Sequence, residues 1–551
     1  MKNIVIIGGN ATGMSAATRL SRINNEDNII LYEKSGIVSY STCSMPFVLG
    51  KVIKDRNALI INTAKDIQNK YGVQVNINHE VIEIDKARKI ITVKNRETLE
   101  EFEQEYDILV LALGTNPTII PFEGIETAKN IFTLNKMDDL DKINDFILTN
   151  NPKKVAIVGA GPIGIECAEN LNRIGVEATV LDLSKQILNA FDVDIAQIAE
   201  KEIIKHGVII NKTISIKEIL DEGKRLLLTN GEYLETDMII LAIGVKPNVQ
   251  LAKEAGLNIS EKGGVIVDEY LLTSDSSIYA GGDMIEVTNR VNLEPTNVSF
   301  GGVANRQGRM IANSIMGDGR PYLGTLATGV VKVGDLIIAS TGLSHKQAIK
   351  EGYDALVCHV IANNHSENFE NSGEITYKLV FDRNTRRILG AQAIGKEGTE
   401  KRIDVTATAL YYNGLVDDLI NLDLCYAPQV NYTKDHVNIA GQIAQNILDE
   451  VFIPFYPKDI KRIVQTGTNI IDVRPAFMYN QCKCNIPNSI NIPYTEIEDS
   501  LEMINFDHDI YITCNEGTTG YKTALFLKRN GFTNDIYNLS GGMKFFEHVK
   551  K

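Results

Sequence analysis

Short apolar runs that end in glycine-rich turns recur along the chain, and each turn leads into a segment with helical spacing. Residues 4–7 run into the turn 8–13, and residues 155–158 run into the turn 159–164. Continuous apolar runs of this length are typical of strands buried on both faces of a parallel sheet. The pattern therefore predicts two α/β units, each beginning with a strand, a glycine turn and a helix.

Both glycine turns have the spacing of a dinucleotide-binding fingerprint, and an acidic residue ends the strand that follows each of them. Such a turn lets the backbone approach a pyrophosphate at a helix N-terminus, and the acid accepts hydrogen bonds from ribose hydroxyls. The acid of the second unit favours NADH over NADPH, although Lys185 lies close by and keeps NADPH open. The predicted nucleotide-binding residues are Gly8, Gly9, Ala11, Gly13 and Glu33 in the first unit and Gly159, Gly161, Gly164 and Asp182 in the second.

The later strands indicate that the second unit is inserted into the first. Residues 106–115 form a buried strand and a glycine turn before the second fingerprint, and residues 237–245 repeat this pattern after it. A third strand, in 277–283, ends at Asp283, whose carboxylate could bind a ribityl chain or a phosphate. We predict one domain formed by residues 1–115 and 246–322, with residues 116–245 inserted in it.

Cys43 is the candidate redox residue of the first unit. It lies ten residues after Glu33, and residues 1–166 contain no other cysteine, so it has no local disulfide partner. A single thiol can instead carry a mixed disulfide, a persulfide or a sulfenic acid. Pro46 suits the first turn of a helix, so we expect Cys43 near a helix N-terminus that favours its thiolate.

These features together resemble the flavin-dependent pyridine-nucleotide disulfide reductases, over residues 1 to about 445. The resemblance implies FAD in the first unit and NADH in the inserted one. It places Thr115 and Asp283 among the cofactor-binding residues. It also implies an α+β dimerisation domain over residues 323–445.

The stretch 39–46 reads SYSTCSMP and resembles the coenzyme A disulfide reductase branch, which includes related NADH oxidases and persulfide reductases. Arg19 and Arg22 lie three residues apart on one helix face, where they could pair with the phosphates of coenzyme A. By this resemblance the substrate contacts are Ser15, Arg19, Arg22, Ser39, Thr42, Asn305, Arg309 and Lys434.

The dimerisation segment implies a composite active site. By the resemblance, Tyr426 comes from the second subunit of a homodimer and stands beside the reactive sulfur, where a phenol can donate a hydrogen bond to a leaving thiolate. The branch usually has a second tyrosine in an H-x-x-Y-Y-P-G stretch, and residues 365–371 of this chain contain none. A persulfide, a polysulfide or another small disulfide therefore becomes a more plausible substrate beside coenzyme A disulfide.

The last segment predicts a second sulfur site. Residues 446–459 read as a linker, and in 460–551 a strand ends on Cys514, followed by a small-residue loop and a helix. Such a loop directs backbone N–H groups at the sulfur. The segment resembles a single-domain rhodanese, with Asp472-Val473-Arg474 among its landmarks, which implies that Cys514 carries sulfane sulfur. Thr519 and Glu516 depart from the pattern of fused relatives, so a docking or sensing module stays open.

The other cysteines are expected to play no chemical part. Cys482 and Cys484 form a CxC pair without the four ligands of a structural zinc site, so we interpret them as incidental. Cys167, Cys358 and Cys425 are interpreted as packing residues, and no metal site is predicted.

Composition narrows the function classes. The 551 residues exceed one domain, and 44% apolar with 23% charged residues is ordinary for a soluble globular chain. The net charge of −14 argues against general nucleic-acid binding. No apolar run approaches the roughly 20 residues that span a bilayer, so we expect a cytoplasmic protein.

Two functional hypotheses follow. The first is an FAD-dependent NADH reductase of coenzyme A disulfide, coenzyme A persulfide or polysulfide, which uses Cys43 and has a rhodanese domain carrying sulfane sulfur. The alternative is an NADH oxidase or peroxidase that cycles Cys43 through a sulfenic acid, with the last segment as a docking or sensing module. The predicted fold class is α/β throughout, with two Rossmann-like domains, an α+β dimerisation domain and an α/β rhodanese domain.

Overall fold

The computed structural model describes residues 1–24 and 26–550. The chain divides into two compact units. The first unit comprises residues 1–187 and 204–325, and the second comprises residues 188–203 together with the chain from residue 326 onward. Among the residues described, no helix combines the length and the apolar character that crossing a membrane requires.

The first sheet of unit 1 is parallel and has the strand order β18-β7-β1-β2-β3. Its strands are β1 (Asn3–Ile7), β2 (Asn28–Tyr32), β3 (Gln74–Asn76), β7 (Ile108–Leu111) and β18 (Ile278–Ala280). β18 pairs with β7, although more than a hundred residues separate them in the chain. The chain therefore leaves this sheet, builds another domain and returns, which confirms the predicted insertion.

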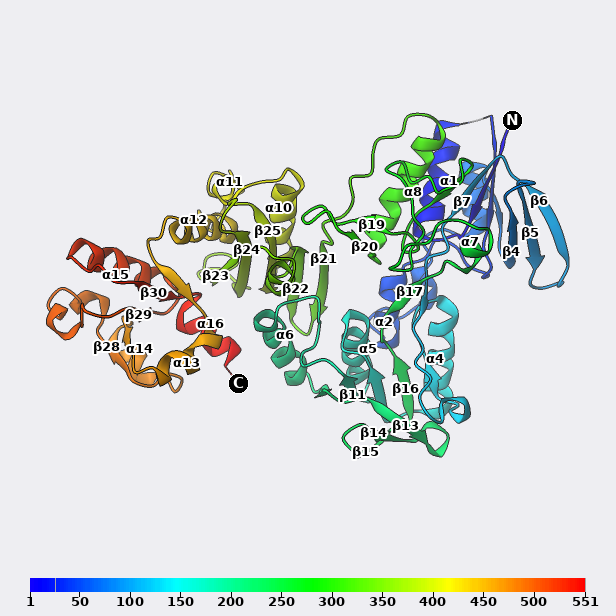
Figure 1. Ribbon diagram of the computed structural model, residues 1–551. Helices are drawn as coiled ribbons and strands as arrows, with labels where there is room; N and C mark the ends of the chain where they lie inside the picture. The colour runs from blue at the N-terminus through cyan, green and yellow to red at the C-terminus, as the bar shows by residue number, and fades with distance from the viewer. Residues whose placement is uncertain (25, 551) are drawn as a thin grey trace. The chain divides into compact units, whose positions relative to one another are not determined.

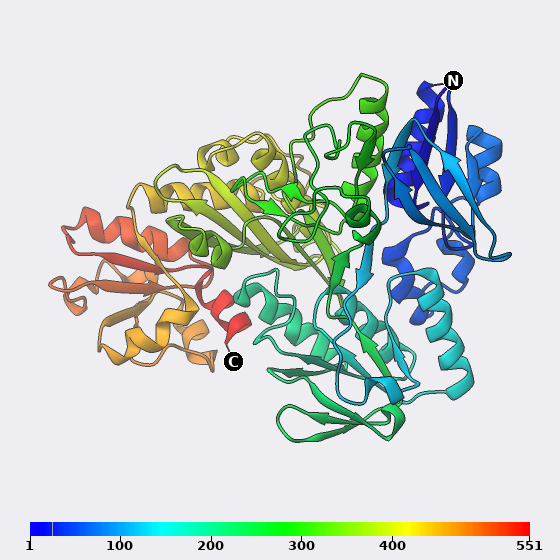
Figure 2. The same cartoon turned by 45° about the vertical axis from the view of Figure 1, so that its right-hand side comes forward.

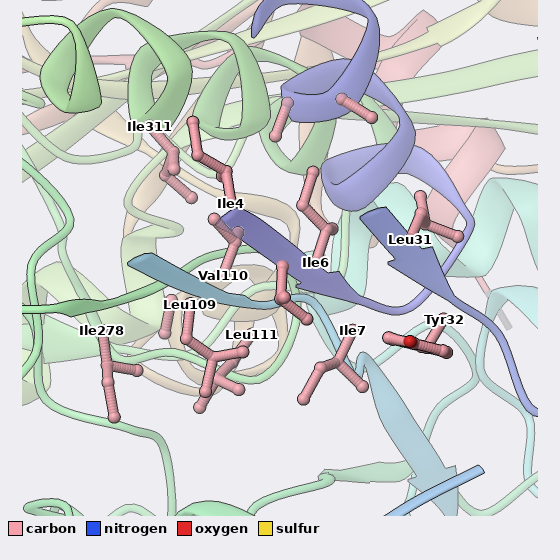
Figure 3. Close-up of a cluster of buried hydrophobic side chains, with 14 of the residues drawn as sticks. Ile4, Ile6, Ile7, Leu31, Tyr32, Leu109, Val110, Leu111, Ile278 and Ile311 are labelled. Carbon is pink, nitrogen blue, oxygen red and sulfur yellow. The ribbon is translucent and has the colours of Figure 1, made fainter. Parts of the chain in front are cut away.

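The core of this domain lies between the sheet and two helices, α1 (Ala11–Ile23) and α8 (Gly301–Ile315). Figure 3 shows Ile4 and Ile6 of β1 on the same side of the sheet as Ile311 of α8. Ile7 and Leu111 point to the opposite face, as the alternation of side chains along a strand requires. Both faces are buried, which explains why these strands read as unbroken apolar runs.

The inserted domain has a second parallel sheet, with the strand order β12-β11-β10-β16-β9. Its strands are β9 (Ile131–Phe132), β10 (Lys154–Val158), β11 (Glu177–Asp182), β12 (Ile209–Lys212) and β16 (Met238–Leu241). Its helices are α4 (Met137–Asn150) and α5 (Pro162–Arg173), whereas most of α6 (Val193–Lys205) lies in the segment 188–203 that belongs to unit 2. β10 and α5 flank the second glycine turn, as predicted.

Smaller elements complete unit 1. Two three-stranded antiparallel sheets are formed by β4 (His79–Asp85), β5 (Ile90–Asn95) and β6 (Glu101–Glu105), and by β13 (Ile216–Leu220), β14 (Arg225–Leu228) and β15 (Tyr233–Glu235). Two-stranded pairs are formed by β8 (Thr115–Pro117) with β17 (Val245–Pro247) and by β19 (Val287–Thr288) with β20 (Pro295–Thr296). The remaining helices are α2 (Met45–Leu49), α3 (Ala64–Tyr71) and α7 (Gln250–Glu254).

Unit 2 contains a five-stranded antiparallel sheet, with the order β21-β22-β25-β24-β23. Its strands are β21 (Gly329–Val333), β22 (Leu336–Gly342), β23 (Ala355–Asn363), β24 (Glu374–Asp382) and β25 (Ile388–Gly395). The helices of this part are α9 (His345–Lys350), α10 (Thr399–Tyr411), α11 (Val416–Ile420) and α12 (His436–Leu448). An antiparallel sheet with helices agrees with the α+β domain predicted here.

The last domain of unit 2 has a parallel sheet, with the order β26-β30-β29-β27-β28. Its strands are β26 (Ile453–Phe455), β27 (Asn469–Asp472), β28 (Ser489–Asn491), β29 (Ile510–Thr513) and β30 (Ile536–Leu539). Its helices are α13 (Ile460–Gln465), α14 (Ala476–Gln481), α15 (Thr518–Arg529) and α16 (Gly542–Val549). In Figures 1 and 2, α15 lies on one side of this sheet, and α13 and α14 lie on the other.

The predicted linker over 446–459 is wrong. Helix α12 continues to Leu448, and β26 pairs in parallel with β30 as the edge strand of the last sheet. The Ile-Pro-Phe sequence suggested a break because proline cannot donate a ladder hydrogen bond, but an edge strand tolerates proline. The last domain therefore begins within this segment.

Candidate active sites

The first glycine turn is shaped by two contacts that only glycine allows. Gly8 has a φ of +106°, and a Cβ there would lie 2.2 Å from the carbonyl oxygen of Ala112. A Cβ on Gly13 would lie 1.9 Å from the carbonyl oxygen of Gly8, so this glycine lets α1 start directly against the turn. The N-terminus of α1 is thereby presented at the end of β1, as a pyrophosphate site requires.

The two acids that follow the turns have the same local geometry. Glu33 accepts hydrogen bonds from the backbone N–H groups of Gly9 (2.9 Å) and Ser35 (2.8 Å). Asp182 accepts them from the N–H groups of Ala160 and Ser184, both at 2.6 Å. Each carboxylate is therefore fixed by a backbone N–H group of its own glycine turn, where a ribose would lie.

The space around these turns fits the implied cofactors. A Cβ on Gly161 would meet no atom within 4 Å, so the second turn leaves room for a ligand to approach the backbone. Burial raises the pKa of Asp283 to about 6, so this carboxyl group is poised to exchange a hydrogen bond with a ligand hydroxyl. Thr115 begins β8, where the chain leaves the first domain. These residues fit FAD in the first domain and NAD(H) in the inserted one.

Cys43 is an exposed free thiol in a short 3-10 turn, Thr42–Ser44, that leads directly into α2. Pro46 occupies the first turn of α2, as predicted. The expected lowering of the Cys43 pKa is wrong for the chain alone. Partial burial, and then the charges of Glu166 and Asp283, raise the pKa of this thiol. A helix of only five residues has too small a dipole to offset these effects.

Glu166 is a functional candidate that the sequence reasoning missed. It lies on α5 of the inserted domain, and its charge acts on Cys43. Burial, and then the charge of Glu169, raise the pKa of Glu166 to about 7, so it titrates at neutral pH. The sequence feature that could have pointed to Glu166 is its position two residues after Gly164, where an acid interrupts the apolar start of a helix.

The predicted substrate contacts on α1 and α8 lie together, because these helices pack against each other. The hydroxyl of Ser15 donates to the backbone oxygen of Asn305 at 2.8 Å, and Arg19 Nε donates to Asn313 Oδ1 at 3.0 Å. Arg22 holds its guanidinium over the ring of Tyr71, with 5.8 Å between the guanidinium carbon and the ring centroid. Arg309 is exposed on α8.

The loop that carries Cys43 is tied to the first glycine turn through Asn10. The side-chain amide of Asn10 donates to the hydroxyl of Thr42 (3.1 Å), and its oxygen accepts from the N–H of Tyr40 (3.3 Å). Ser39 is buried and has a φ of +51°, and its N–H donates to the backbone oxygen of Gly9. The asparagine that replaces the usual second glycine therefore positions the loop of the reactive thiol.

The predicted contacts Tyr426 and Lys434 belong to unit 2, where both are exposed. The segment of Tyr426 lies beside the tyrosine-free stretch 365–371, because the N–H of Ser366 donates to the backbone oxygen of Pro428 at 3.1 Å. The two stretches are therefore neighbours in unit 2. The roles of Tyr426 and Lys434 toward a substrate stay predictions.

Cys514 lies at the end of β29 in the predicted strand–loop–helix arrangement. The N–H groups of Gly517 (3.1 Å) and Gly520 (3.2 Å) donate to its Sγ. Burial raises the pKa of this thiol, and these hydrogen bonds act in the opposite direction. The loop therefore surrounds the sulfur with donors that stabilise a thiolate or a persulfide.

Two further features of this domain bear on the predictions. Arg474 and Asp472 form a buried ion pair at 2.7 Å. Glu516, which we expected to disfavour an anionic donor, has its charge offset by Lys544, whose Nζ lies 3.1 Å from the carboxylate. Lys544 comes from α16, far along the sequence from the loop, so its effect could not be read from the local pattern.

The remaining cysteines divide into three kinds. Cys167 and Cys358 are buried, as expected of packing residues. Cys425 is exposed, so its predicted packing role is wrong; it lies in the irregular segment before Tyr426. Cys482 and Cys484 meet each other and Glu547, a third group that their sequence neighbourhood does not contain.

Three segments of the chain match known families. Residues 2–308 match the family described as pyridine nucleotide-disulphide oxidoreductase, and residues 328–436 match the dimerisation domain of that family. Residues 456–548 match the rhodanese-like domain. The first match alone spans more than half of the 551 residues.

Among characterised relatives, a coenzyme A disulfide reductase of Staphylococcus aureus (strain JH9) is 32% identical over 446 residues, which are 81% of this chain and 100% of the relative. An NADH oxidase of Methanocaldococcus jannaschii is 32% identical over 442 residues, which are 80% of this chain and 98% of the relative. The aligned lengths of 446 and 442 residues are close to the length of the chain before the rhodanese-like domain, whose match begins at residue 456.

Two solved structures are similar over almost the whole chain. The structure of reduced Bacillus anthracis CoADR-RHD is 38% identical, with a TM-score of 0.97, and the match covers 100% of this chain and 98% of that one. An NAD-dependent persulfide reductase from A. fulgidus is 32% identical, with a TM-score of 0.91 and coverage of 98% and 99%. The chain belongs to the FAD-dependent pyridine nucleotide-disulphide oxidoreductases and carries a rhodanese-like domain after its dimerisation domain.

Proposed function

We propose that the protein is an NADH-dependent reductase of small thiol disulfides and persulfides, with Cys43 as its reacting thiol and coenzyme A derivatives as its preferred substrates. The observation that carries the proposal is the position of Cys43, an unpaired and exposed thiol that Asn10 ties to the first nucleotide-binding turn. The coenzyme A disulfide reductase and the persulfide reductase among its relatives support this substrate class.

The cofactors fit the two glycine-turn domains. We assign FAD to residues 1–115 and 246–322 and NADH to residues 116–245, where Asp182 is held at the ribose position. A bound FAD would supply the redox chemistry that links NADH to the sulfur of Cys43. The chain itself positions that sulfur and sets its protonation.

The chemistry at Cys43 needs one sulfur nucleophile. The thiolate attacks one sulfur of the substrate, the sulfur–sulfur bond breaks, and a thiol or sulfide leaves. Cys43 then holds a mixed disulfide or a persulfide, which the electron pair from NADH cleaves to return the thiolate. In this scheme Ser39 and Thr42 position the loop, and the α1–α8 surface with Arg19, Arg22 and Arg309 binds the phosphates of the substrate.

Two further roles complete the proposal. We assign Cys514 as a carrier of sulfane sulfur, because its buried Sγ accepts hydrogen bonds from two backbone N–H groups of the loop that follows it. We also propose a homodimer in which Tyr426 of one subunit completes the Cys43 site of the other, since residues 328–436 match a dimerisation domain.

The test is anaerobic NADH consumption by the holoenzyme with coenzyme A disulfide, coenzyme A persulfide and polysulfide, each compared with the Cys43→Ser variant. We expect Cys43→Ser to lose at least 100-fold in kcat with every sulfur substrate, while electron transfer from NADH to an artificial dye continues. Cys425→Ser, which removes another exposed thiol, serves as the matched control and retains activity.

Oxygen separates the proposal from its rival. The similarity to an NADH oxidase favours a second candidate, in which Cys43 cycles through a sulfenic acid. If oxygen supports faster NADH turnover than every sulfur substrate, the reductase proposal fails and the oxidase is favoured.

A further inference from the structure

The last domain contains a second pair of thiols outside the Cys514 loop. Cys482 lies at the end of α14, and Cys484 follows two residues later. Their Sγ atoms are 2.6 Å apart, and the backbone N–H of Cys484 also donates to the Cys482 sulfur at 3.4 Å. Both side chains are only partly buried, at an open depression lined by Gln481, Cys482, Lys483, Cys484, Glu547 and Lys550.

A carboxylate from another element faces both sulfurs. Glu547 on α16 accepts from Cys484 Sγ at 2.9 Å and from Cys482 Sγ at 3.1 Å. The hydrogen bond from Cys484 is the main cause that lowers the pKa of Glu547, so the acid is ionised at neutral pH. It therefore accepts hydrogen bonds from both thiols, and its negative charge disfavours the thiolate of Cys484.

The surroundings distinguish the two cysteines. Burial tends to lower the pKa of the Arg474 guanidinium. Its hydrogen bonds and ion pair with Asp472, followed by its interaction with Cys482, outweigh burial, and the pKa of Arg474 is raised overall. Arg474 therefore interacts with Cys482 as well as with Asp472. Burial is the main cause that raises the pKa of the Cys484 thiol, and the neighbouring Cys482 and Glu547 raise it further. Cys484 therefore stays protonated up to a higher pH than a free thiol.

The set of possible ligands favours a redox pair over a structural metal site. Among the residues that the structure describes, Cys482 and Cys484 gather one further ligand, Glu547, and this carboxylate is exposed. A structural zinc ion is almost always held by four ligands. Two thiols whose Sγ atoms are in contact can instead close a disulfide when they are oxidised.

We propose that Cys482 and Cys484 form a second, flavin-independent redox site, a dithiol that reduces the sulfur–sulfur bond of small disulfides or persulfides. The Cys482 thiolate attacks the substrate RS–SR′, forms a bond to one sulfur and expels RS⁻ as a thiol. The Cys484 thiol then attacks Cys482 in this adduct and releases R′SH, or sulfide when the substrate is a persulfide. Two protein thiols are oxidised to one disulfide, and one substrate bond is reduced.

Two molecules of a small thiol return the pair to its reduced form and leave as a disulfide. These steps use neither Cys43 nor Cys514, so the site adds an activity to the proposed function. A disulfide released in this way belongs to the substrate class that we assign to the flavin-dependent half.

The experiment uses the full-length holoenzyme with the changes Cys43→Ser and Cys514→Ser, which leave this pair in place. The protein is reduced, freed of reductant and mixed without oxygen with glutathione disulfide in one arm and glutathione persulfide in the other. Peptide mass spectrometry after alkylation identifies the state of residues 482 and 484, and released thiol and sulfide are measured. We expect one Cys482–Cys484 disulfide per chain, with two thiols released in the first arm and one thiol and one sulfide in the second.

Single substitutions in the same background assign the two roles. Cys484→Ser should stop at a stable glutathione adduct on Cys482, whereas Cys482→Ser should form adducts at least 10-fold more slowly. Glu547→Gln should speed disulfide formation several-fold, because it removes a negative charge that disfavours the Cys484 thiolate. Lys550 also lines the depression, and Lys550→Met is a control expected to change the rate less than Glu547→Gln.

The proposal is overturned if the double-serine background forms no 482–484 disulfide in either arm while the protein stays folded by circular dichroism. It is also overturned if one zinc ion per chain copurifies, protects both thiols from alkylation and is lost in Cys482→Ser. Failure of the Cys43 test alone leaves these outcomes unaffected, since that residue is absent from the background used here.

Discussion

At the scale of single residues, the protonation of Cys43 depends on a charge that changes near neutral pH. Glu166 raises the pKa of the Cys43 thiol when it is ionised, and its own pKa is about 7. Its ionised form is therefore present above pH 7, and its effect is lost as the pH falls through 7. The thiolate is thus disfavoured most at alkaline pH, where it would otherwise form.

We predict that Glu166→Gln lowers the pKa of Cys43 and increases its alkylation by iodoacetamide two- to fivefold above pH 7, because a repelling charge is removed. Below pH 6 the variant and the wild type should react alike. The rate is followed on the Cys43 peptide of the holoenzyme by mass spectrometry. Glu177→Gln, at an exposed acid that begins β11, is the control; equal rate profiles for Glu166→Gln and the wild type would contradict the assignment.

The sequence alone could predict the positions of those site residues whose local geometry depends on their neighbours in the chain. The glycines of the two turns, Glu33 and Cys514 follow from local spacing, since a strand, a turn and a helix fix their geometry together. Glu166, Lys544 and Glu547 could not be found in this way. Glu166 and Glu547 act on cysteines of other elements, Lys544 acts on Glu516 in the Cys514 loop, and only the folded chain brings these groups together.

At the scale of elements, the loop between β29 and α15 aims two N–H groups at one sulfur because Gly517 has a φ of +93°. Alanine adopts this conformation at a cost of about 1–2 kcal/mol. We predict that Gly517→Ala lowers the free energy of unfolding by about that amount and reduces persulfide formation at Cys514 several-fold. Persulfide is measured by mass spectrometry of the full chain after incubation with polysulfide.

The chain offers a matched control for this prediction. Gly531 has a φ of +89°, lies in the same domain and has open space around it, so Gly531→Ala carries a similar backbone cost away from the sulfur. It should lower stability while leaving persulfide formation unchanged. If Cys514 of the wild type forms no persulfide, the sulfur-carrier role is wrong and a docking or sensing role for the domain is favoured.

Element boundaries show where the sequence pattern is informative and where it is not. The parallel strands were predictable because burial on both faces makes them unbroken apolar runs, as in β1 and β10. β26 was mistaken for a linker because Pro454 lies within it and Pro457 follows closely, and an edge strand carries few of the signals of a central one.

At the scale of the whole molecule, unit 2 is held together by a buried ionic cluster. Lys378 of the antiparallel sheet lies 2.8 Å from Asp194 and 3.1 Å from Asp192, and all three side chains are mostly buried. His359 of the same sheet bonds Asp194 (3.1 Å) and the hydroxyl of Ser540 in the rhodanese-like domain (2.9 Å). The cluster therefore joins segments from three parts of the sequence.

We predict that Lys378→Met lowers the free energy of unfolding by about 3–5 kcal/mol, because two carboxylates are left buried without their cation. Adding Asp194→Asn to this variant should restore part of the loss. Thermal and denaturant unfolding of the full chain measure the effect, and Lys332→Met, at an exposed lysine on β21, is the control. A change below 1 kcal/mol for Lys378→Met would show that the cluster does not hold unit 2 together.

The pairing of β26 with β30 has a consequence for how this architecture can be taken apart. Only four residues separate the end of α12 from this strand, and the hydroxyl of Tyr456 bonds the backbone oxygen of Val357 in the antiparallel sheet at 3.1 Å. The terminal module is therefore joined to the antiparallel sheet by a short connection and by direct contacts, and not by a long free linker. Removing the module would take Phe545 off the ring of His359 and break the hydrogen bond between Tyr456 and Val357, so it would expose a part of the antiparallel sheet that is covered in the full chain.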